Sequence, residues 1–227
     1  MKMKTIRIAI DGPAGAGKST IAKMAAEKLN YTYVDTGAMY RAITYKSMEH
    51  QLDLSDENGL VELLKQTTIE LRPSESGQQV YLDGINVSDE IRTTEVTSNV
   101  SEVAAHARVR QDLVDRQMIL AQTGGVIMDG RDIGTHVIPD AELKIFMSAS
   151  ADERARRRLL DNEKRGIPSD LQQLKADIIK RDKLDSEREA SPLVQAEDAI
   201  YLDTTNLSID QVVEKIVQLA KEKESAV

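Results

Sequence analysis

Hydrophobic and polar positions separate the chain into short apolar runs and longer helical stretches. Five runs are rich in aliphatic residues and have the length of buried strands; they cover residues 5–10, 31–34, 125–129, 143–147 and 199–203. Stretches with apolar residues at helical spacing lie between most of them. Because strands that alternate with helices form parallel sheets covered on both faces, we predict a three-layer α/β fold with a five-stranded parallel sheet.

Apolar residues recur at helical spacing in five stretches. These stretches cover residues 20–29, 41–65, 94–122, 151–163 and 208–224. The second is interrupted at residues 52–55, and the third is predicted to bend near His106. Ser169 and Ser208 are each followed by glutamine at the spacing of a capping box, which predicts that a helix starts at both positions.

The stretch from about 66 to 90 changes to the alternating period of strands. Residues 68–72 and 79–82 alternate, residues 74–77 form a turn, and Asp83-Gly84 is a strong hairpin signal. An antiparallel hairpin does not fit inside a parallel sheet. We therefore predict a small antiparallel β insert at the edge of the ligand cleft, where it is free to move.

A glycine-rich loop between the first strand and the first helix carries the strongest chemical signal. It matches the phosphate-binding P-loop pattern G-x-x-x-x-G-K-[ST] with Gly12, Pro13, Ala14, Gly15, Ala16, Gly17, Lys18 and Ser19. The backbone N–H groups of such a loop and the following helix dipole attract a polyphosphate. Lys18 would bring a cation to the outer phosphates, and the Ser19 hydroxyl would bind Mg²⁺. The alternative is a flexible turn with a stray lysine, which the flanking strand and helix disfavour.

Composition indicates a water-soluble protein of one domain. The 227 residues are 41% hydrophobic and 30% charged, and no apolar run approaches the length of a membrane span. Cysteine is absent and the three histidines are scattered, which excludes disulfides, thiolate metal sites and a histidine cluster. Lys2 and Lys4 precede an apolar run that stops at Asp11, unlike a secretory signal. We expect a cytoplasmic protein.

The charge distribution favours a small anionic ligand. The formal net charge is −8 and the pI is near 5.1, opposite to the usual sign for a protein that binds duplex nucleic acid. Tryptophan is absent and Phe146 is the single phenylalanine, so a platform for stacking bases is not expected. Arginines are concentrated locally at Arg154, Arg156, Arg157, Arg158, Arg181 and Arg188. A local arginine cluster in an acidic chain indicates a small polyanion.

Charged residues follow two of the predicted strands at the edge where parallel sheets bind ligands. Asp35, Thr36 and Arg41 come after the second strand and should face the cleft. The alternative for Arg41 is a solvated helix arginine. Asp129 ends the third strand, where a Walker B aspartate would hold Mg²⁺ beside a P-loop. The alternative for Asp129 is a helix N-cap.

Three further charged residues would share one face of the helix that starts near residue 169. Arg181, Asp185 and Arg188 have the spacing of either a binding surface or a solvated salt bridge. Phosphoryl transfer needs positioning, charge neutralisation and exclusion of water, and arginine binds phosphate bidentately. The P-loop, the acid, the insert and the arginines together predict a kinase of a small acceptor that closes on both substrates.

Longer motifs connect the chain to a family. They occupy residues 11–19, 35–41, 91–93, 130–135 and 181–188, and include Gly-Arg-Asp-Ile-Gly-Thr at 130–135. In this order they resemble the bacterial-type cytidylate (CMP) kinases over essentially the whole chain. The P-loop occurs in many enzymes, whereas the later motifs are specific to this family, and the antiparallel insert matches its NMP-binding region. Position 36 is threonine where some members have serine, which keeps the hydroxyl.

For the phosphoryl donor, the resemblance implies that ATP is held by the P-loop together with Thr20 and Arg157. Lys18, Asp129 and Arg131 would be catalytic. The implied cofactor is Mg²⁺, with Ser19 and Asp129 on the metal. The implied reaction transfers the γ-phosphoryl group of ATP to CMP or dCMP, giving CDP or dCDP and ADP.

For the acceptor, the resemblance implies a second set of residues. These are Thr36, Arg41, Ser101, Arg110, Arg131, Asp132, Arg181, Asp185 and Arg188. Arg41 and Arg131 would hold the phosphate, Arg181 and Asp185 the ribose, and the cytosine would be read by Ser101, Arg110, Asp132 and Arg188. Asp132 and Ser101 can accept from the N4 amine of cytosine, whereas uracil has an oxygen there. An unpaired polar group costs roughly 1–3 kcal/mol.

The resemblance also implies a division of residues 1–227 within a single P-loop kinase domain. The core would comprise residues 1–40, 120–150 and 190–227, the NMP-binding region about 41–119 with the insert sheet at about 66–90, and a short helical lid about 150–168. We expect a monomer whose partners are nucleotides, with no nucleic acid and no membrane.

Three alternative functions remain open. The first is a P-loop kinase that acts on another acceptor such as UMP. The second is a GTPase switch, but this sequence lacks the Asn-Lys-x-Asp motif that such a protein uses to bind guanine. The third is a nucleic-acid-dependent ATPase, which the net charge disfavours.

Overall fold

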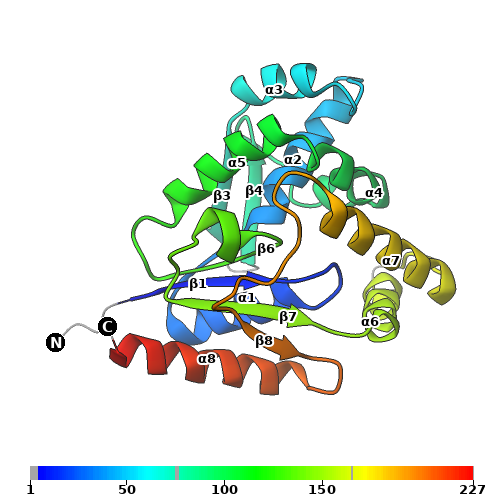
Figure 1. Ribbon diagram of the computed structural model, residues 1–227. Coiled ribbons are helices and arrows are strands. Elements are labelled where there is room, and N and C mark those ends of the chain that lie inside the picture. The colour runs from blue at the N-terminus through cyan, green and yellow to red at the C-terminus, as the bar shows by residue number, and fades with distance from the viewer. Residues whose placement is uncertain (1–4, 75–76, 165, 227) are drawn as a thin grey trace.

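A five-stranded parallel sheet forms the middle layer of the computed structural model, which describes residues 5–74, 77–164 and 166–226 (Figure 1). The strands lie in the order β2-β6-β1-β7-β8, and each neighbouring pair is parallel. Their bounds are β1 (Arg7–Asp11), β2 (Thr32–Asp35), β6 (Val126–Gly130), β7 (Leu143–Ser148) and β8 (Ile200–Asp203). The predicted parallel sheet is confirmed. Lys2, Lys4, part of the turn at 74–77 and residue 165 of the predicted lid lie outside the described residues.

The central strand β1 buries alternate residues on opposite faces of the sheet. Ile8 and Ile10 pack with α1 (Lys18–Leu29) and α8 (Ile209–Ala226). Ala9 faces the other side, where it packs with residues of β6 and of a π-helical turn, Ile133–Val137. A strand buried on both faces needs aliphatic residues at consecutive positions, which is the pattern of Ile8, Ala9 and Ile10 in the middle of β1.

Four helices pack together beyond β2 and β6 and form a second apolar cluster. They are α2 (Thr36–Glu49), α3 (Glu57–Lys65), α4 (Thr94–Val103) and α5 (Ala107–Leu120). Met39 and Ile43 of α2 meet Leu60 of α3 and Leu113 of α5, and all four side chains are buried. This group of helices lies above the sheet in Figure 1.

The predicted insert is a three-stranded antiparallel sheet. It consists of β3 (Ile69–Ser74), β4 (Gly77–Leu82) and β5 (Ile85–Asn86), followed by a 3-10 turn, Glu90–Arg92. Val80 and Leu82 of β4 pack on Ala38 and Ala42 of α2. The insert therefore rests on the helix that follows β2.

Two helices, α6 (Ala151–Lys164) and α7 (Leu171–Glu187), connect β7 to β8 and lie beside the P-loop (Figure 1). The capping box predicted at Ser169 is wrong by one residue. Asp170 caps α7 and accepts from the Gln173 N–H at 2.8 Å, whereas Ser169 Oγ accepts from Asn162 Nδ2 at 2.6 Å. The Asp170 carboxylate lies one position after the Ser169 hydroxyl and competes with it for the unpaired backbone N–H groups in the first turn of α7.

The capping box predicted for the last helix is confirmed. The Ser208 N–H donates to Gln211 Oε1 at 2.9 Å, and the Gln211 N–H donates to Ser208 Oγ at 3.2 Å. Two other helix boundaries differ from prediction. The helix predicted from residue 41 already begins at Thr36, because Asp35 caps it by accepting from the Ala38 N–H at 2.9 Å. The bend predicted near His106 is a break between α4 and α5.

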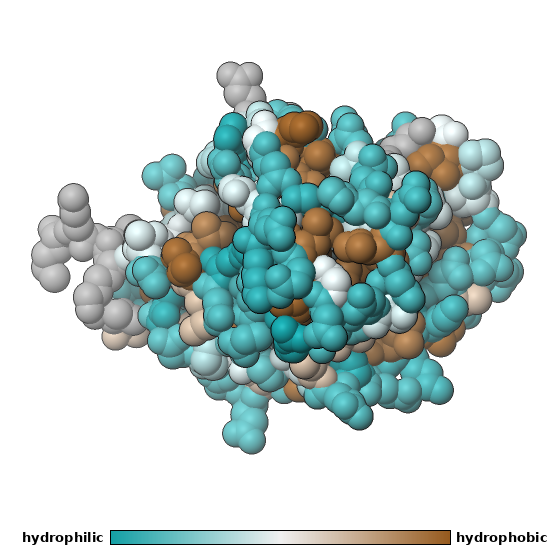
Figure 2. Space-filling model, turned by 90° about the horizontal axis from the view of Figure 1, so that it is seen from above, coloured by the Kyte–Doolittle hydropathy of each residue, from teal (hydrophilic) through white to brown (hydrophobic). Residues whose placement is uncertain are grey.

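Seen from above, hydrophilic residues cover most of the surface and hydrophobic residues are scattered among them (Figure 2). Among the described residues, no helix combines the length and the hydropathy needed to cross a membrane.

Gly12 gives the clearest test of how the P-loop is fixed to the sheet. Its φ is +147°, and a Cβ at this position would lie 2.0 Å from the carbonyl oxygen of Met147 on β7. We expect Gly12→Ala to lower the free energy of unfolding by about 3 kcal/mol, because backbone must move. Urea denaturation measures this loss. Gly84→Ala is the control, since Gly84 also has positive φ but open space around it; equal losses in both variants would contradict the steric argument.

Candidate active site

The P-loop joins the end of β1 to the start of α1 and carries the predicted phosphate-binding residues 12–19. Lys18 is buried, and its Nζ donates to the carbonyl oxygen of Pro13 at 2.9 Å. Burial and then repulsion from Arg131 lower the pKa of Lys18 to about 7. Phosphate oxygens would remove this penalty, because an anion nearby favours the protonated amine. Thr20 follows on α1 and is exposed.

Asp129 lies inside β6 next to the first turn of α1. Ser19 Oγ donates to its Oδ2 at 2.9 Å, and Tyr33 of β2 donates to its Oδ1 at 2.8 Å. Thr36 Oγ1 donates to the Asp129 backbone carbonyl at 2.7 Å. The alternative of a helix N-cap is therefore wrong. Burial and the nearby charge of Asp35 raise the pKa of Asp129 to about 6.

The Ser19 hydroxyl and the Asp129 carboxylate form a pair of hard oxygen donors. Mg²⁺ prefers such donors and is usually bound by one or two protein oxygens together with substrate phosphates. Among the described residues, no group of three or more His, Cys, Asp or Glu side chains could hold a metal by itself. The pair therefore fits a metal that arrives with a nucleotide.

Arg41 faces inward from α2. Its Nη2 donates to Asp35 Oδ2 at 2.8 Å, and its buried Nε has no hydrogen-bond partner among the residues that the structure describes. Burial alone would raise the pKa of Asp35, but Arg41 and Arg92 outweigh burial and hold this pKa below its ordinary value. The side chain of Arg41 is only 17% exposed and is paired with Asp35, so the alternative of a solvated helix arginine is wrong.

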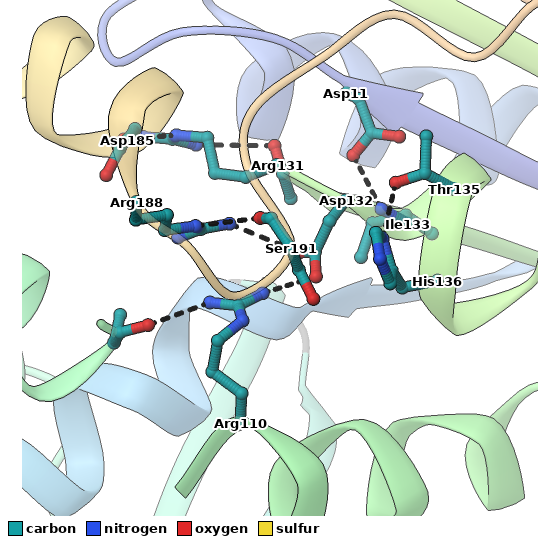
Figure 3. A network of polar contacts seen from close by, with 12 residues as sticks. Asp11, Arg110, Arg131, Asp132, Ile133, Thr135, His136, Asp185, Arg188 and Ser191 are labelled. Carbon is teal, nitrogen blue, oxygen red and sulfur yellow. Dashed lines mark hydrogen bonds and ion pairs between the residues drawn. The ribbon is translucent and has the colours of Figure 1, made fainter. Parts of the chain in front are cut away.

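Arg131 and Asp185 join the end of β6 to α7. Arg131 Nε donates to Asp185 Oδ2 at 2.9 Å (Figure 3). Arg181 lies on the same helix as Asp185, and burial together with repulsion from Arg131 lowers its pKa to about 10. Its Nε is buried and finds no hydrogen-bond partner within the described part of the chain. The alternative of a solvated salt bridge on α7 is therefore wrong for Asp185, whose ion-pair partner comes from another element.

Asp132 lies between two arginines in the interior (Figure 3). Asp132 and Arg110 are 4% and 3% exposed and form a hydrogen-bonded ion pair. Arg188 Nη2 lies 3.8 Å from the other carboxylate oxygen, and Arg188 Nε donates to the Ser191 carbonyl at 2.8 Å. The Arg110 guanidinium also lies 5.2 Å from the ring centre of Tyr40. One carboxylate thus faces two buried cations.

Ser101 and Arg157 complete the predicted set. Ser101 lies half-buried on α4, near its end; the Ala104 carbonyl just beyond accepts from Arg110 Nη1 at 3.0 Å. Arg157 projects from α6 toward the P-loop, where Nη1 lies 3.4 Å from the Ala16 carbonyl oxygen. Its Nη2 donates to the Thr204 carbonyl at 2.7 Å. The residues predicted to bind the phosphoryl donor and those predicted to bind the acceptor therefore gather around the carboxyl ends of β1, β2 and β6.

A sequence model of the family described as cytidylate kinase matches residues 8–222. This chain belongs to the cytidylate kinase family. The resemblance found in the sequence motifs is confirmed. A cytidylate kinase from Lysinibacillus sphaericus is 65% identical over 220 residues, which cover 97% of this chain and 98% of the relative. One from Anoxybacillus flavithermus is 58% identical over 220 residues, with the same coverage.

Solved structures share the fold at much lower identity. An uncharacterised protein from Eubacterium ventriosum superposes with a TM-score of 0.51 at 14% sequence identity, covering 96% of this chain and 99% of that chain. This similarity concerns the fold alone.

Asp11 belongs to the first cytidylate kinase motif, but the sequence did not predict what its side chain contacts. It ends β1, and its two carboxylate oxygens accept from the backbone N–H groups of Ile133 and Gly134 at 2.8 and 2.7 Å (Figure 3). Burial raises the pKa of Asp11 to about 6, although these two donors lower it. The residue before the P-loop thus fixes the loop that carries Arg131 and Asp132.

The sequence placed Arg154 in a local arginine cluster but did not predict which residues it contacts. It is 6% exposed, and its Nη1 donates to the Ala14 carbonyl of the P-loop at 3.0 Å. The same nitrogen lies 2.7 Å from Asp182 on α7. In this cytidylate kinase family member, Arg154 therefore joins α6, α7 and the P-loop.

Proposed function

We propose that this protein transfers the γ-phosphoryl group of ATP to CMP or dCMP, giving CDP or dCDP and ADP. The observation that carries the proposal is the buried Asp132 between Arg110 and Arg188, next to the arginines that would bind a phosphate. Relatives at 65% and 57% identity bear the name cytidylate kinase.

In this proposal the acceptor base meets Asp132, Arg110 and Arg188. The carboxylate accepts from the N4 amine of cytosine, and the guanidinium groups donate to its carbonyl oxygen and ring nitrogen. Ser101 would add a hydroxyl on the same side. UMP, the alternative acceptor, is not favoured, because its O4 would face a carboxylate and leave two acceptors opposed.

The rest of the acceptor would be held by cations that lack a full set of partners. Arg41 and Arg131 would bind the phosphate, and Arg181 and Asp185 the ribose hydroxyls. In the described ranges 5–74, 77–164 and 166–226, the buried Nε atoms of Arg41 and Arg181 have no hydrogen-bond partner, and a ligand oxygen would satisfy such groups. Thr36, whose hydroxyl touches the Asp129 carbonyl, would border the acceptor phosphate.

The donor phosphates would lie on the backbone N–H groups of residues 12–20, with Arg157 at their outer side. Mg²⁺, carried by ATP and held through Ser19 and Asp129, would neutralise charge on the phosphate oxygens. Lys18 and Arg131 would stabilise the charge that develops on the transferred group. Both are fixed before substrate binds, so little reorganisation is needed during transfer.

We further propose a cytoplasmic monomer with a core at 1–40, 120–150 and 190–227, an NMP-binding region at about 41–119 and a lid at about 150–168.

The test of the function is ADP release measured with ATP-Mg²⁺ and each nucleoside monophosphate in turn. CMP and dCMP should give the highest kcat/KM. A higher value for UMP, AMP or dTMP would overturn the proposal.

Arginines on α6 suggest that the lid orders when nucleotides bind. Arg154, Arg156, Arg157 and Arg158 crowd positive charge onto one helix, and Asp182 and Glu153 already pair with Arg154 and Arg157. A bound polyphosphate would add further negative charge to this cluster and so favour its ordered form. We expect hydrogen exchange of backbone amides in residues 151–164 to slow by about tenfold on adding an unreactive ATP analogue with CMP. Mass spectrometry of peptides from this segment measures the change. Residues 209–226 of α8 are the internal control, and an unchanged rate in the lid would contradict the idea.

A further inference from the structure

Tyr33 places a hydroxyl at the metal side of the candidate active site. It lies on β2, which is paired with β6, and its OH donates to Asp129 Oδ1 at 2.8 Å across the two strands. An ordinary phenol is protonated at neutral pH and a carboxylate only accepts, so the Tyr33 hydroxyl is the donor in this bond.

The two carboxylate oxygens of Asp129 are held by different elements. Ser19 of α1 donates to Oδ2, and Tyr33 of β2 donates to Oδ1. One donor alone leaves a carboxylate free to rotate about its bond to Cβ, whereas two donors on separate oxygens fix its plane. The Ser19 oxygen keeps its lone pairs when it donates its proton, so it can still bind a cation.

The ring of Tyr33 has a separate, structural role. It packs against the apolar cluster of β1, α1 and α8. The hydroxyl reaches Asp129, and Tyr33 also borders a groove of about 590 Å³ between α1 and the insert, whose lining includes Ser19, Thr20 and Gln78. Removing only the hydroxyl therefore separates its effect from that of the packed ring.

We infer that Tyr33 is a positioning residue that orients the Asp129 carboxylate toward the nucleotide-bound divalent cation and so sets the affinity of the site for that cation. The inference rests on the proposed function only in assigning Ser19 and Asp129 to the metal. Partners that hydrogen-bond to metal-binding carboxylates typically contribute tenfold or more to metal affinity.

Tyr33→Phe tests the inference, and Tyr31→Phe is the matched control. Tyr31 also carries a hydrogen-bonded hydroxyl and is half-buried, but the partners of this hydroxyl are the Ile6 N–H and Glu224, away from Asp129. Mn²⁺ binding is measured by electron paramagnetic resonance in the presence of an unreactive ATP analogue. Affinity for the same analogue without metal is measured by calorimetry.

We expect Tyr33→Phe to weaken Mn²⁺ binding by about tenfold and to raise the Mg²⁺ concentration for half-maximal turnover by a similar factor. Metal-free nucleotide binding and the KM for CMP should not change, and Tyr31→Phe should match the wild type. Tyr33→Leu, which also lacks the hydroxyl, should show the same loss of Mn²⁺ affinity.

Unchanged Mn²⁺ affinity in Tyr33→Phe would overturn the inference, as would an equal loss of metal-free nucleotide affinity, which indicates a general structural role. Failure of the proposed function is separate. It would appear as a wild-type protein that does not phosphorylate CMP, while the Mn²⁺ measurement would still decide the role of Tyr33.

Discussion

Lys18→Ala is expected to lower kcat by about a thousandfold, or about 4 kcal/mol of transition-state stabilisation. Lys18 is the cation that the P-loop itself supplies, and its Nζ is anchored to the Pro13 carbonyl inside that loop. Burial disfavours the charged amine in the absence of phosphate, so its removal should not destabilise the fold. Coupled ADP release measures the loss, and thermal melting checks the fold.

Lys28→Ala is the control for this prediction. Lys28 lies on the same helix as Lys18, but at its exposed C-terminal end. Its replacement should leave turnover within about a factor of two, as usual for a surface change of small free energy. A folded Lys18→Ala variant with near-normal turnover would remove the P-loop from the mechanism.

Asp132→Asn is expected to narrow the preference for CMP over UMP. A hydrogen bond to a charged group contributes about 1.5–3 kcal/mol, so kcat/KM for CMP should fall about ten- to a hundredfold. UMP should lose less or even gain, because asparagine can present its NH₂ group to the O4 of uracil. The carboxylate charge that this substitution removes lies between Arg110 and Arg188. Part of the loss in kcat/KM will therefore come from weaker anchoring of these two arginines.

The ratio of the two substrates separates base reading from anchoring. If Asp132 only holds the neighbouring arginines, both substrates should lose the same factor in kcat/KM. Asp132 is not the residue that anchors Arg131, because Arg131 Nε donates to Asp185 Oδ2 at 2.9 Å. Measuring kcat/KM for CMP and UMP on the wild type and Asp132→Asn decides the matter, and an unchanged ratio would rule out a base-reading role.

Local patterns in the sequence predicted most of the fold. The parallel sheet, the antiparallel insert and the capping box at Ser208 depend on residues close together along the chain, where period and turn chemistry are informative. The start of α2 was missed because Asp35 was interpreted only as a ligand-facing residue, although it also caps the helix. One side chain can satisfy both demands, and the sequence does not separate them.

The site was predictable only in part, because several of its contacts join distant segments. Motifs identified the residues, but not the pairing of Arg131 with Asp185 or of Asp132 with Arg110. The bond from Tyr33 to Asp129 depends on β2 lying next to β6, which the chain order does not reveal. Such contacts follow from strand order and packing, which single-sequence patterns do not contain.

The connection between β7 and β8 has a consequence for how the two nucleotides influence each other. α6 touches the P-loop through Arg154, which is also paired with Asp182 of α7, and α7 carries Asp185, the partner of Arg131. Under the proposed function, a nucleotide that restrains one helix would also restrain the other, so the conformational entropy lost in ordering the pair would be shared. We therefore expect the nucleotide that binds first to lower the cost of binding the second. Thermodynamic reciprocity would then require ATP and CMP to raise each other's affinity by the same factor, whatever the order in which they bind.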